Sequence, residues 1–150
     1  MENKSFSKVI ESRNYSNVDG KKAYNSDVES LSIGYSKDEN GYLELITRIL
    51  KDDGSFDELP MNRAIDLAIM ICETSLHFRD AYSLPNFYDK DNPVIDRIGM
   101  QGDAMTVSIC DSNCDIDIDV KVLHDELNKQ GELIGERFRT LSRLLNELGY

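Results

Sequence analysis

The sequence predicts an α+β fold in which an antiparallel sheet of about three to four strands packs against a central buried helix and two C-terminal helices. Segments with the two-residue alternation of strands come early in the chain, and apolar residues at helical spacing come late. This order favours an antiparallel sheet covered by helices over a parallel βαβ repeat. The chain of 150 residues is expected to form a single domain, since domains cluster near ~100–150 residues.

Residues 1–28 are polar and contain turn signals such as Asp19-Gly20. We expect this N-terminal arm to pack on the domain, with an edge strand near its start. The residues expected to attach the arm are apolar or aromatic: Phe6, Val9, Ile10, Tyr15 and Tyr24.

A β-hairpin is predicted between Leu31 and Ile49. Apolar and small residues alternate from Leu31 to Ser36, which is the period of a half-buried strand. Residues 38–41 (Asp-Glu-Asn-Gly) then reverse the chain, because Asn-Gly is a strong hairpin signal. The return strand places apolar side chains on one face and charged ones on the other: Leu43, Leu45 and Ile49, opposite Glu44 and Arg48.

Pro60 is predicted to open a long helix that ends near Tyr82, since proline suits the first helical turn. Apolar residues cover most of the circumference of this helix, so it is expected to be buried on several sides at the centre of the fold. Cys72 lies in one of the apolar rows and is interpreted as a small core residue.

Two shorter elements follow the long helix. Asn92-Pro93 is a good start for a helix, which predicts a one- to two-turn helix over Pro93–Ile98. Apolar residues then alternate with Thr106 and Ser108, which predicts a strand from Met105 to Ile109.

Two C-terminal helices are predicted, one that is capped by Asp115 and ends at Gly131, and another over Glu132–Leu148. Gly135 inside the last helix costs ~1 kcal/mol relative to alanine. Close packing against another backbone would offset this cost, which motivates a homodimer hypothesis. Two arginines of this helix are interpreted as members of surface ion pairs with nearby glutamates: Arg139 and Arg143, with Glu136 and Glu147.

The charge balance disfavours two classes of partner. The chain has 28 acidic and 17 basic residues and a net charge of −11, which repels phosphate backbones and anionic lipid. No apolar run approaches the ~20 residues that span a bilayer. We therefore expect no nucleic-acid partner and no membrane association.

The cytoplasm is the predicted compartment. The first five residues lack the basic and apolar regions of a signal peptide. The three cysteines are an odd number, so a disulfide framework is not expected.

No metal site and no cofactor are predicted. Asp111, Asn113 and Asp115 occupy the first three ligand positions of a calcium-binding loop, but Ile116 and Val122 stand where that loop needs glycine and a bidentate glutamate. We interpret the acidic run as the start of a helix.

A zinc site is also disfavoured, because its candidate ligands lack the usual paired spacing: Cys110, Cys114, His77 and His124. Common hydrolase, kinase and dinucleotide-binding motifs are absent from the sequence.

The connection over residues 88–103 is the candidate ligand site. It is longer than the usual ~4–6 residues, and long connections are often functional. Arg97 offers a planar donor group for a carboxylate or phosphate, and two glycines let backbone N–H groups approach a ligand. The candidate ligand-binding residues are Arg97, Gln101, Asp103, Asn92 and Tyr88. A structural alternative stays open, in which Arg97 pairs with Asp96 or Asp103 and the glycines only make turns.

Three functional hypotheses follow. The first is a non-enzymatic module that binds a small polar or anionic ligand at residues 88–103. The second is an enzyme that uses the same pocket, with Asp103 or Asp96 as general base and Arg97 stabilising developing negative charge. The third is a protein–protein interaction domain.

Residues 92–108 (Asn-Pro-Val-Ile-Asp-Arg-Ile-Gly-Met-Gln-Gly-Asp-Ala-Met-Thr-Val-Ser) and residues 131–137 (Gly-Glu-Leu-Ile-Gly-Glu-Arg) resemble a group of small uncharacterised bacterial proteins. The similarity also takes in residues 17–20 and 24–27, and so spans most of the chain. The group has no assigned activity, so the resemblance implies no functional residues. It implies a bacterial or bacteriophage source.

Overall fold

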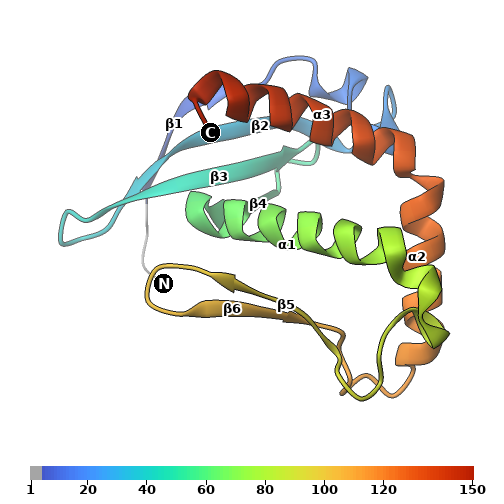
Figure 1. Ribbon diagram of the computed structural model, residues 1–150. Coiled ribbons are helices and arrows are strands. Elements are labelled where there is room, and N and C mark those ends of the chain that lie inside the picture. Colours follow the sequence, from blue (N-terminus) through green and yellow to red (C-terminus); the bar gives the residue numbers. More distant parts are fainter. Residues whose placement is uncertain (1–4) are drawn as a thin grey trace. The chain divides into compact units, whose positions relative to one another are not determined.

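The computed structural model describes residues 5–150 and confirms the predicted α+β class (Figure 1). The chain forms two compact units, Met1–Ala68 and Ile69–Tyr150, and helix α1 (Met61–Asp80) passes from one into the other. That all 150 residues act as one domain stays a prediction. Short 3-10 helices supplement the main elements at Tyr15–Asn17, Gly20–Lys22, Ala81–Ser83 and Pro85–Phe87.

The first unit contains a four-stranded antiparallel sheet in the order β1-β2-β3-β4. Its strands are β1 (Ser5–Glu11), β2 (Val28–Lys37), β3 (Leu43–Lys51) and β4 (Phe56–Pro60). The predicted hairpin is confirmed as β2 and β3, and the Asp38 carboxylate accepts the backbone N–H groups of Asn40 and Tyr42, each at 2.9 Å, within its turn. The sequence does not predict β4, because its residues are mostly polar and Pro60 resembles a helix start.

The hairpin buries the face that carries its small residues. Ser30, Ser32 and Ser36 of β2 are buried, whereas Ile33 and Tyr35 on the opposite face are exposed. On the buried face, the Arg48 guanidinium lies between two aromatic rings, 4.0 Å from the Phe6 ring centre and 3.8 Å from that of Phe56. Alternation therefore predicts the strand correctly, but the buried face is the one that carries the small residues and not the apolar ones.

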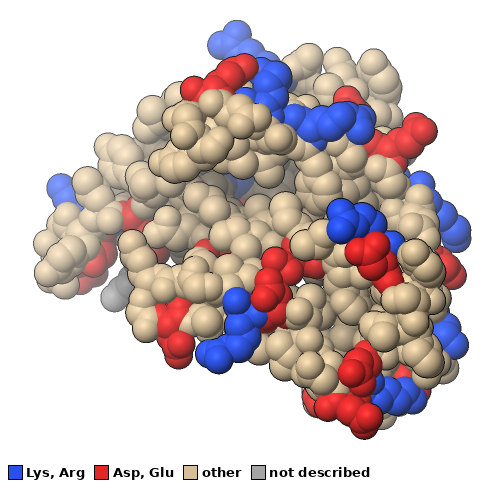
Figure 2. Space-filling model, viewed as in Figure 1, with Lys and Arg blue, Asp and Glu red and all other residues tan. Residues whose placement is uncertain are grey.

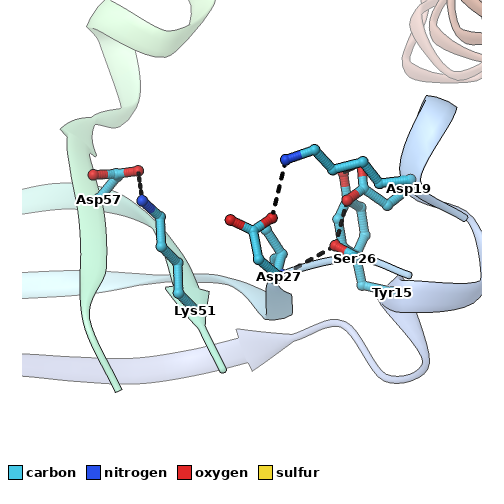
Figure 3. A network of polar contacts seen from close by, with 8 residues as sticks. Tyr15, Asp19, Ser26, Asp27, Lys51 and Asp57 are labelled. Atoms are coloured by element: carbon cyan, nitrogen blue, oxygen red, sulfur yellow. Dashed lines mark hydrogen bonds and ion pairs between the residues drawn. The ribbon is translucent and has the colours of Figure 1, made fainter. Parts of the chain in front are cut away.

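The segment that precedes β2 contacts this sheet, while the packing of residues 1–28 as one arm stays a prediction. Strand β1 pairs with β2 at the sheet edge. Beyond it, the Tyr15 and Ser26 hydroxyls both donate to the Asp19 carboxylate (Figure 3). The Ser26 hydroxyl also accepts the N–H of Val28 at 2.9 Å, at the start of β2. Tyr24 does not pack as predicted: it is 80% exposed.

Ion pairs continue this polar network on the surface of the first unit. Lys22 lies 3.4 Å from the Asp27 carboxylate, and Lys51 of β3 lies 3.4 Å from that of Asp57 on β4 (Figure 3). Exposed pairs of this kind typically contribute about 0–1 kcal/mol each, so they add little to the stability of the sheet.

Helix α1 exists close to its predicted bounds, but its expected burial on several sides is wrong. Phe78 is its only buried residue among those described. Cys72 is exposed, so its interpretation as a core residue is also wrong. Five other large apolar residues of the helix remain about half exposed: Ile65, Leu67, Met70, Ile71 and Leu76. An apolar circumference makes burial of a helix favourable, but the helix is buried only where other elements pack against it.

The second unit adds a β-hairpin and two helices to the end of α1. The hairpin pairs β5 (Val94–Gly99) with β6 (Ala104–Ser108). The short helix predicted over Pro93–Ile98 is therefore wrong. Val94, Ile95 and Ile98 are β-branched and favour extended backbone, and pairing with β6 satisfies their N–H and C=O groups.

Both predicted C-terminal helices are confirmed as α2 (Ile116–Lys129) and α3 (Gly131–Leu148). Gly131 begins α3 rather than ending α2, and Gln130 alone separates the two helices. The core of the unit brings residues from α1, the following connection, the end of β6 and α2 together: Phe78, Ala81, Tyr88, Ile109 and Val120. Within residues 5–150, no helix combines the length and apolarity that crossing a membrane requires.

Candidate functional site

The structure places Arg97, Gln101 and Asp103 on the exposed β5–β6 hairpin. Arg97 lies on β5, and its Nη2 is 3.9 Å from the Asp103 carboxylate. Residues 100–103 form the tight turn, in which Met100 N–H donates to the Asp103 carbonyl at 2.9 Å and Gly102 has a φ of 94°. This geometry corresponds to the structural alternative, an ion pair beside a turn glycine.

Tyr88 and Asn92 lie at the other end of β5 from this turn. A six-residue strand extends roughly 20 Å, so Tyr88 and Asn92 precede the strand while Gln101 and Asp103 follow it (Figure 1). The five predicted residues thus divide into two groups rather than lining one wall. That any of them binds a ligand stays a prediction.

Tyr88 belongs to a closed polar cluster at the start of α2. Its hydroxyl donates to one oxygen of Asp117 at 3.0 Å, and Lys90 Nζ lies 2.8 Å from the other. Lys90 and the Tyr88 hydroxyl lower the pKa of Asp117, whereas burial, followed by the hydrogen bond to Asp117, raises the pKa of Tyr88. At neutral pH the cluster therefore holds an anion, a cation and a neutral phenol, all with partners, and it fastens this segment to α2.

Asp96, one of the two candidate bases, interacts with α1. Its carboxylate accepts the Arg97 N–H at 2.7 Å, and its hydrogen bond with Glu73 helps raise the pKa of Glu73, after the larger effect of burial. Asp103, the other candidate, accepts the Ala104 N–H at 2.7 Å and is 91% exposed, so nothing encloses a substrate around it.

The second unit contains a concave site that the sequence does not reveal. The C-terminal half of α1, the end of α2 and the first half of α3 line a partly open groove of about 210 Å³, and Figure 1 shows these three segments meeting. The lining residues of this three-helix groove are Ser75, Phe78, Arg79, Leu127, Asn128, Gly131, Ile134, Gly135 and Phe138. Four of them are large and apolar, so the groove has an apolar wall with polar groups beside it.

One arginine lines this groove, and a second lies beside one of its lining glycines. Arg79 pairs with its sequence neighbour Asp80 at 3.4 Å, and both side chains are largely exposed. Arg139 Nη1 lies 3.2 Å from the position that a Cβ on Gly135 would occupy. The predicted pair of Arg143 with Glu147 is confirmed at 2.9 Å. The predicted ion pair of Arg139 is not found, since Arg139 has no hydrogen bond or ion pair within residues 5–150.

The two histidines have packing roles. His77 Nε2 lies 2.9 Å from the Phe87 carbonyl oxygen, and the His124 ring stacks on Phe87 with ring centres 4.4 Å apart. His124 Nε2 is 3.5 Å from the side-chain nitrogen of Asn128, which connects it to the three-helix groove. Among residues 5–150, no three His, Cys, Asp or Glu side chains are grouped to hold a metal ion.

The acidic run before α2 is arranged as a helix start. Asn113, rather than Asp115, provides the side-chain contacts: its Oδ1 accepts the Asp115 N–H at 3.0 Å and its Nδ2 donates to Asp119 at 2.8 Å. Asp115 occupies the cap position without a side-chain hydrogen bond to the helix.

Comparison with known proteins identifies a family but no activity. No curated protein and no solved structure matches the chain. A family model matches residues 1–150, which confirms the resemblance to an uncharacterised group, while a bacterial source stays a prediction. Because that match spans the full sequence, the chain belongs to the family of unknown function DUF6530.

Proposed function

We propose that this protein is a non-enzymatic cytoplasmic module that binds a small polar or anionic ligand, and that the three-helix groove is its site. The observation that carries the proposal is the guanidinium of Arg139, which lies beside the groove without a partner among the described residues. The chain has 28 acidic residues against 17 basic ones, so acidic partners are plentiful. A guanidinium kept apart from them is suited to an anion from outside the chain.

Gly135 supports this assignment. Its missing Cβ leaves space for the Arg139 side chain, because a methyl group there would lie 3.2 Å from Nη1. A glycine inside a helix costs ~1 kcal/mol relative to alanine, and close packing of another backbone was expected to offset this cost. In the structure the Arg139 guanidinium, and not a backbone, lies close to Gly135. Concave sites with apolar walls and a few polar groups are the usual form of small-molecule sites.

A cytoplasmic location is supported by the cysteines. Cys72, Cys110 and Cys114 are all exposed and free, as expected in a reducing compartment. Acidic and basic side chains are interspersed among uncharged residues on the face shown in Figure 2, which is typical of proteins that remain dispersed in water.

Ligand binding is testable by thermal shift with nucleotides, sugar phosphates and organic acids. A ligand at 100 times its dissociation constant stabilises the native state by about 2.7 kcal/mol, or roughly 5–10 °C for a chain of this size. We expect Arg139→Gln to lose this shift. Arg143→Gln is the matched control, because Arg143 is on the same helix but pairs with Glu147.

The hairpin residues are tested in the same assay. If Arg97→Gln, and not Arg139→Gln, abolishes the shift, the ligand binds at residues 97–103 as the sequence predicts. If no compound stabilises the protein, the ligand-binding proposal fails and the protein-interaction hypothesis is favoured. Turnover of a stabilising compound would instead favour the enzyme hypothesis.

We also infer a homodimer, formed through α3 of two copies. This helix exposes a row of leucines at helical spacing: Leu141, Leu144, Leu145 and Leu148. A self-complementary surface of this kind forms two-fold dimers, in which the same residues of both copies meet.

A further inference from the structure

Resting on the proposed function, we infer that the ligand of the three-helix groove is a carboxylate with a compact apolar tail, of the size of one aromatic ring or a short acyl chain. The groove contains both of the environments that such a molecule needs. Aromatic and aliphatic side chains form one part of its lining, and guanidinium, amide and hydroxyl groups form another.

The apolar tail is indicated by the groove's wall. Phe78 and Phe138 contribute aromatic rings from α1 and α3, and Leu127 and Ile134 contribute branched side chains. The Phe78 ring is buried and makes an edge contact with His77, with ring centres 5.0 Å apart. A buried ring fixed in this way presents a stable surface to an apolar group, whereas a fully polar ligand would lose its hydration there without replacement.

The size of the tail follows from the volume. The groove measures about 210 Å³, and a dry apolar cavity of about 150 Å³ accepts benzene. One ring, or an acyl chain of similar bulk, therefore fills the apolar part and leaves room for one head group.

The head group is indicated by one guanidinium group in the lining and a second one next to it. Arg79 of α1 lines the groove, and Arg139 of α3 lies beside it, with its Nη1 near the lining residue Gly135. The planar donor fork of arginine matches the two oxygens of a carboxylate. A phosphate dianion is less suitable in a chain of net charge −11, since the surrounding acidic residues repel a double charge more strongly than a single one.

Gly131 provides a variant that fills the groove without disturbing the fold. It lines the groove, its φ is not in the left-handed region, and a Cβ added there meets no heavy atom within 4 Å. Gly131→Leu therefore occupies ligand space while replacing glycine by a better helix former. Loss of binding in a variant whose melting temperature is not lowered would identify the groove as the site.

The test measures binding of three kinds of probe to the full chain by calorimetry. Phenylacetate and hexanoate carry head and tail, acetate and inorganic phosphate carry a head alone, and 2-phenylethanol carries a tail alone. We expect only phenylacetate and hexanoate to bind measurably. Arg139→Gln and Arg79→Gln should each weaken binding by about tenfold or more, as expected for loss of a hydrogen bond to a charged group.

Gly131→Leu should abolish binding of phenylacetate and hexanoate, and Arg143→Gln should leave it unchanged. If inorganic phosphate or acetate binds as tightly as phenylacetate and loses affinity in Arg139→Gln, the tail inference is overturned but the proposed anion site stands. If none of these probes binds, or binding survives both Gly131→Leu and Arg139→Gln, the tail inference and the assignment of the groove both fail.

Discussion

At the scale of single residues, Gly34 shows how close packing of strands depends on a missing side chain. A Cβ on Gly34 would lie 1.9 Å from the Ser7 carbonyl oxygen and 3.0 Å from the Phe6 ring, so alanine there forces β1 away from β2. We expect Gly34→Ala to reduce the free energy of unfolding by about 1–3 kcal/mol, as overpacking does, when measured by urea denaturation. Gly99→Ala is the control, since its Cβ meets nothing within 4 Å; equal stabilities of the two variants would contradict the prediction.

The raised pKa of Glu73 is expected to make the stability of the protein depend on pH. Burial and the Asp96 contact raise its pKa in the folded protein above 4.5. A raised pKa contributes stability below the unfolded pKa, and this contribution is lost as the pH rises through the folded pKa. Glu73→Gln should therefore gain stability relative to wild type between pH 4 and pH 7, as measured by urea denaturation at both values. An identical difference at the two pH values would show that the carboxyl pair is not formed.

The contacts of some single side chains can be predicted from the sequence, and those of others cannot. The Arg143–Glu147 pair follows from their spacing on one helix and was predictable. Arg139 lies only three residues from Glu136 on the same helix, but the position of its side chain depends on Gly135 and on the groove beside it. The groove joins α1 to α2 and α3, segments some fifty residues apart in sequence, and no local pattern encodes that meeting.

At the scale of elements, the contact between residues 88–90 and α2 depends on Asp117. The pKa of Asp117 is lowered in the folded protein. Its ionised carboxylate therefore stabilises the fold at pH values above the pKa of an unfolded aspartate, and this stabilisation is lost as the pH falls through the folded pKa. We expect Asp117→Asn to speed amide hydrogen exchange in residues 88–93 and in the first turn of α2 at neutral pH. The effect should shrink in acid, where wild-type Asp117 is itself protonated.

Asp115→Asn is the control for this exchange experiment. It removes an acidic charge from the same helix end, but Asp115 makes no side-chain hydrogen bond to the helix. Faster exchange of residues 88–93 in Asp115→Asn as well would mean that the charge alone, and not the contact with Tyr88 and Lys90, holds the segment.

Secondary-structure elements differ in how far the local sequence determines them. The β2–β3 hairpin was predicted because its turn is fixed locally by Asp38, Asn40 and Gly41. Strand β5 was predicted as a helix, because Asn92-Pro93 favours a helix start while pairing with β6 decides the outcome. The buried face of β2 was also unpredictable, since the rings of Phe6 and Phe56 and the Arg48 side chain between them arrive from other strands.

At the scale of the whole molecule, net charge and the α3 leucines act against each other. Two copies that each carry −11 repel, while contact between Leu141, Leu145 and Leu148 of both copies removes apolar surface from water. Salt shortens the screening length from about 10 Å at 0.1 M to about 3 Å at 1 M. Light scattering should therefore show dimerisation that strengthens as salt is raised.

Charged substitutions decide whether α3 forms this contact. Leu145→Glu places a carboxylate in the proposed interface, and we expect a monomer at every salt concentration, since a buried unpaired charge is costly. Val122→Glu on α2 is the matched control, because Val122 is also exposed and apolar but lies outside α3; it should dimerise as wild type does. A wild-type monomer at all concentrations and salts would remove the homodimer, and a dimer that survives Leu145→Glu would place its interface elsewhere than on the α3 leucines.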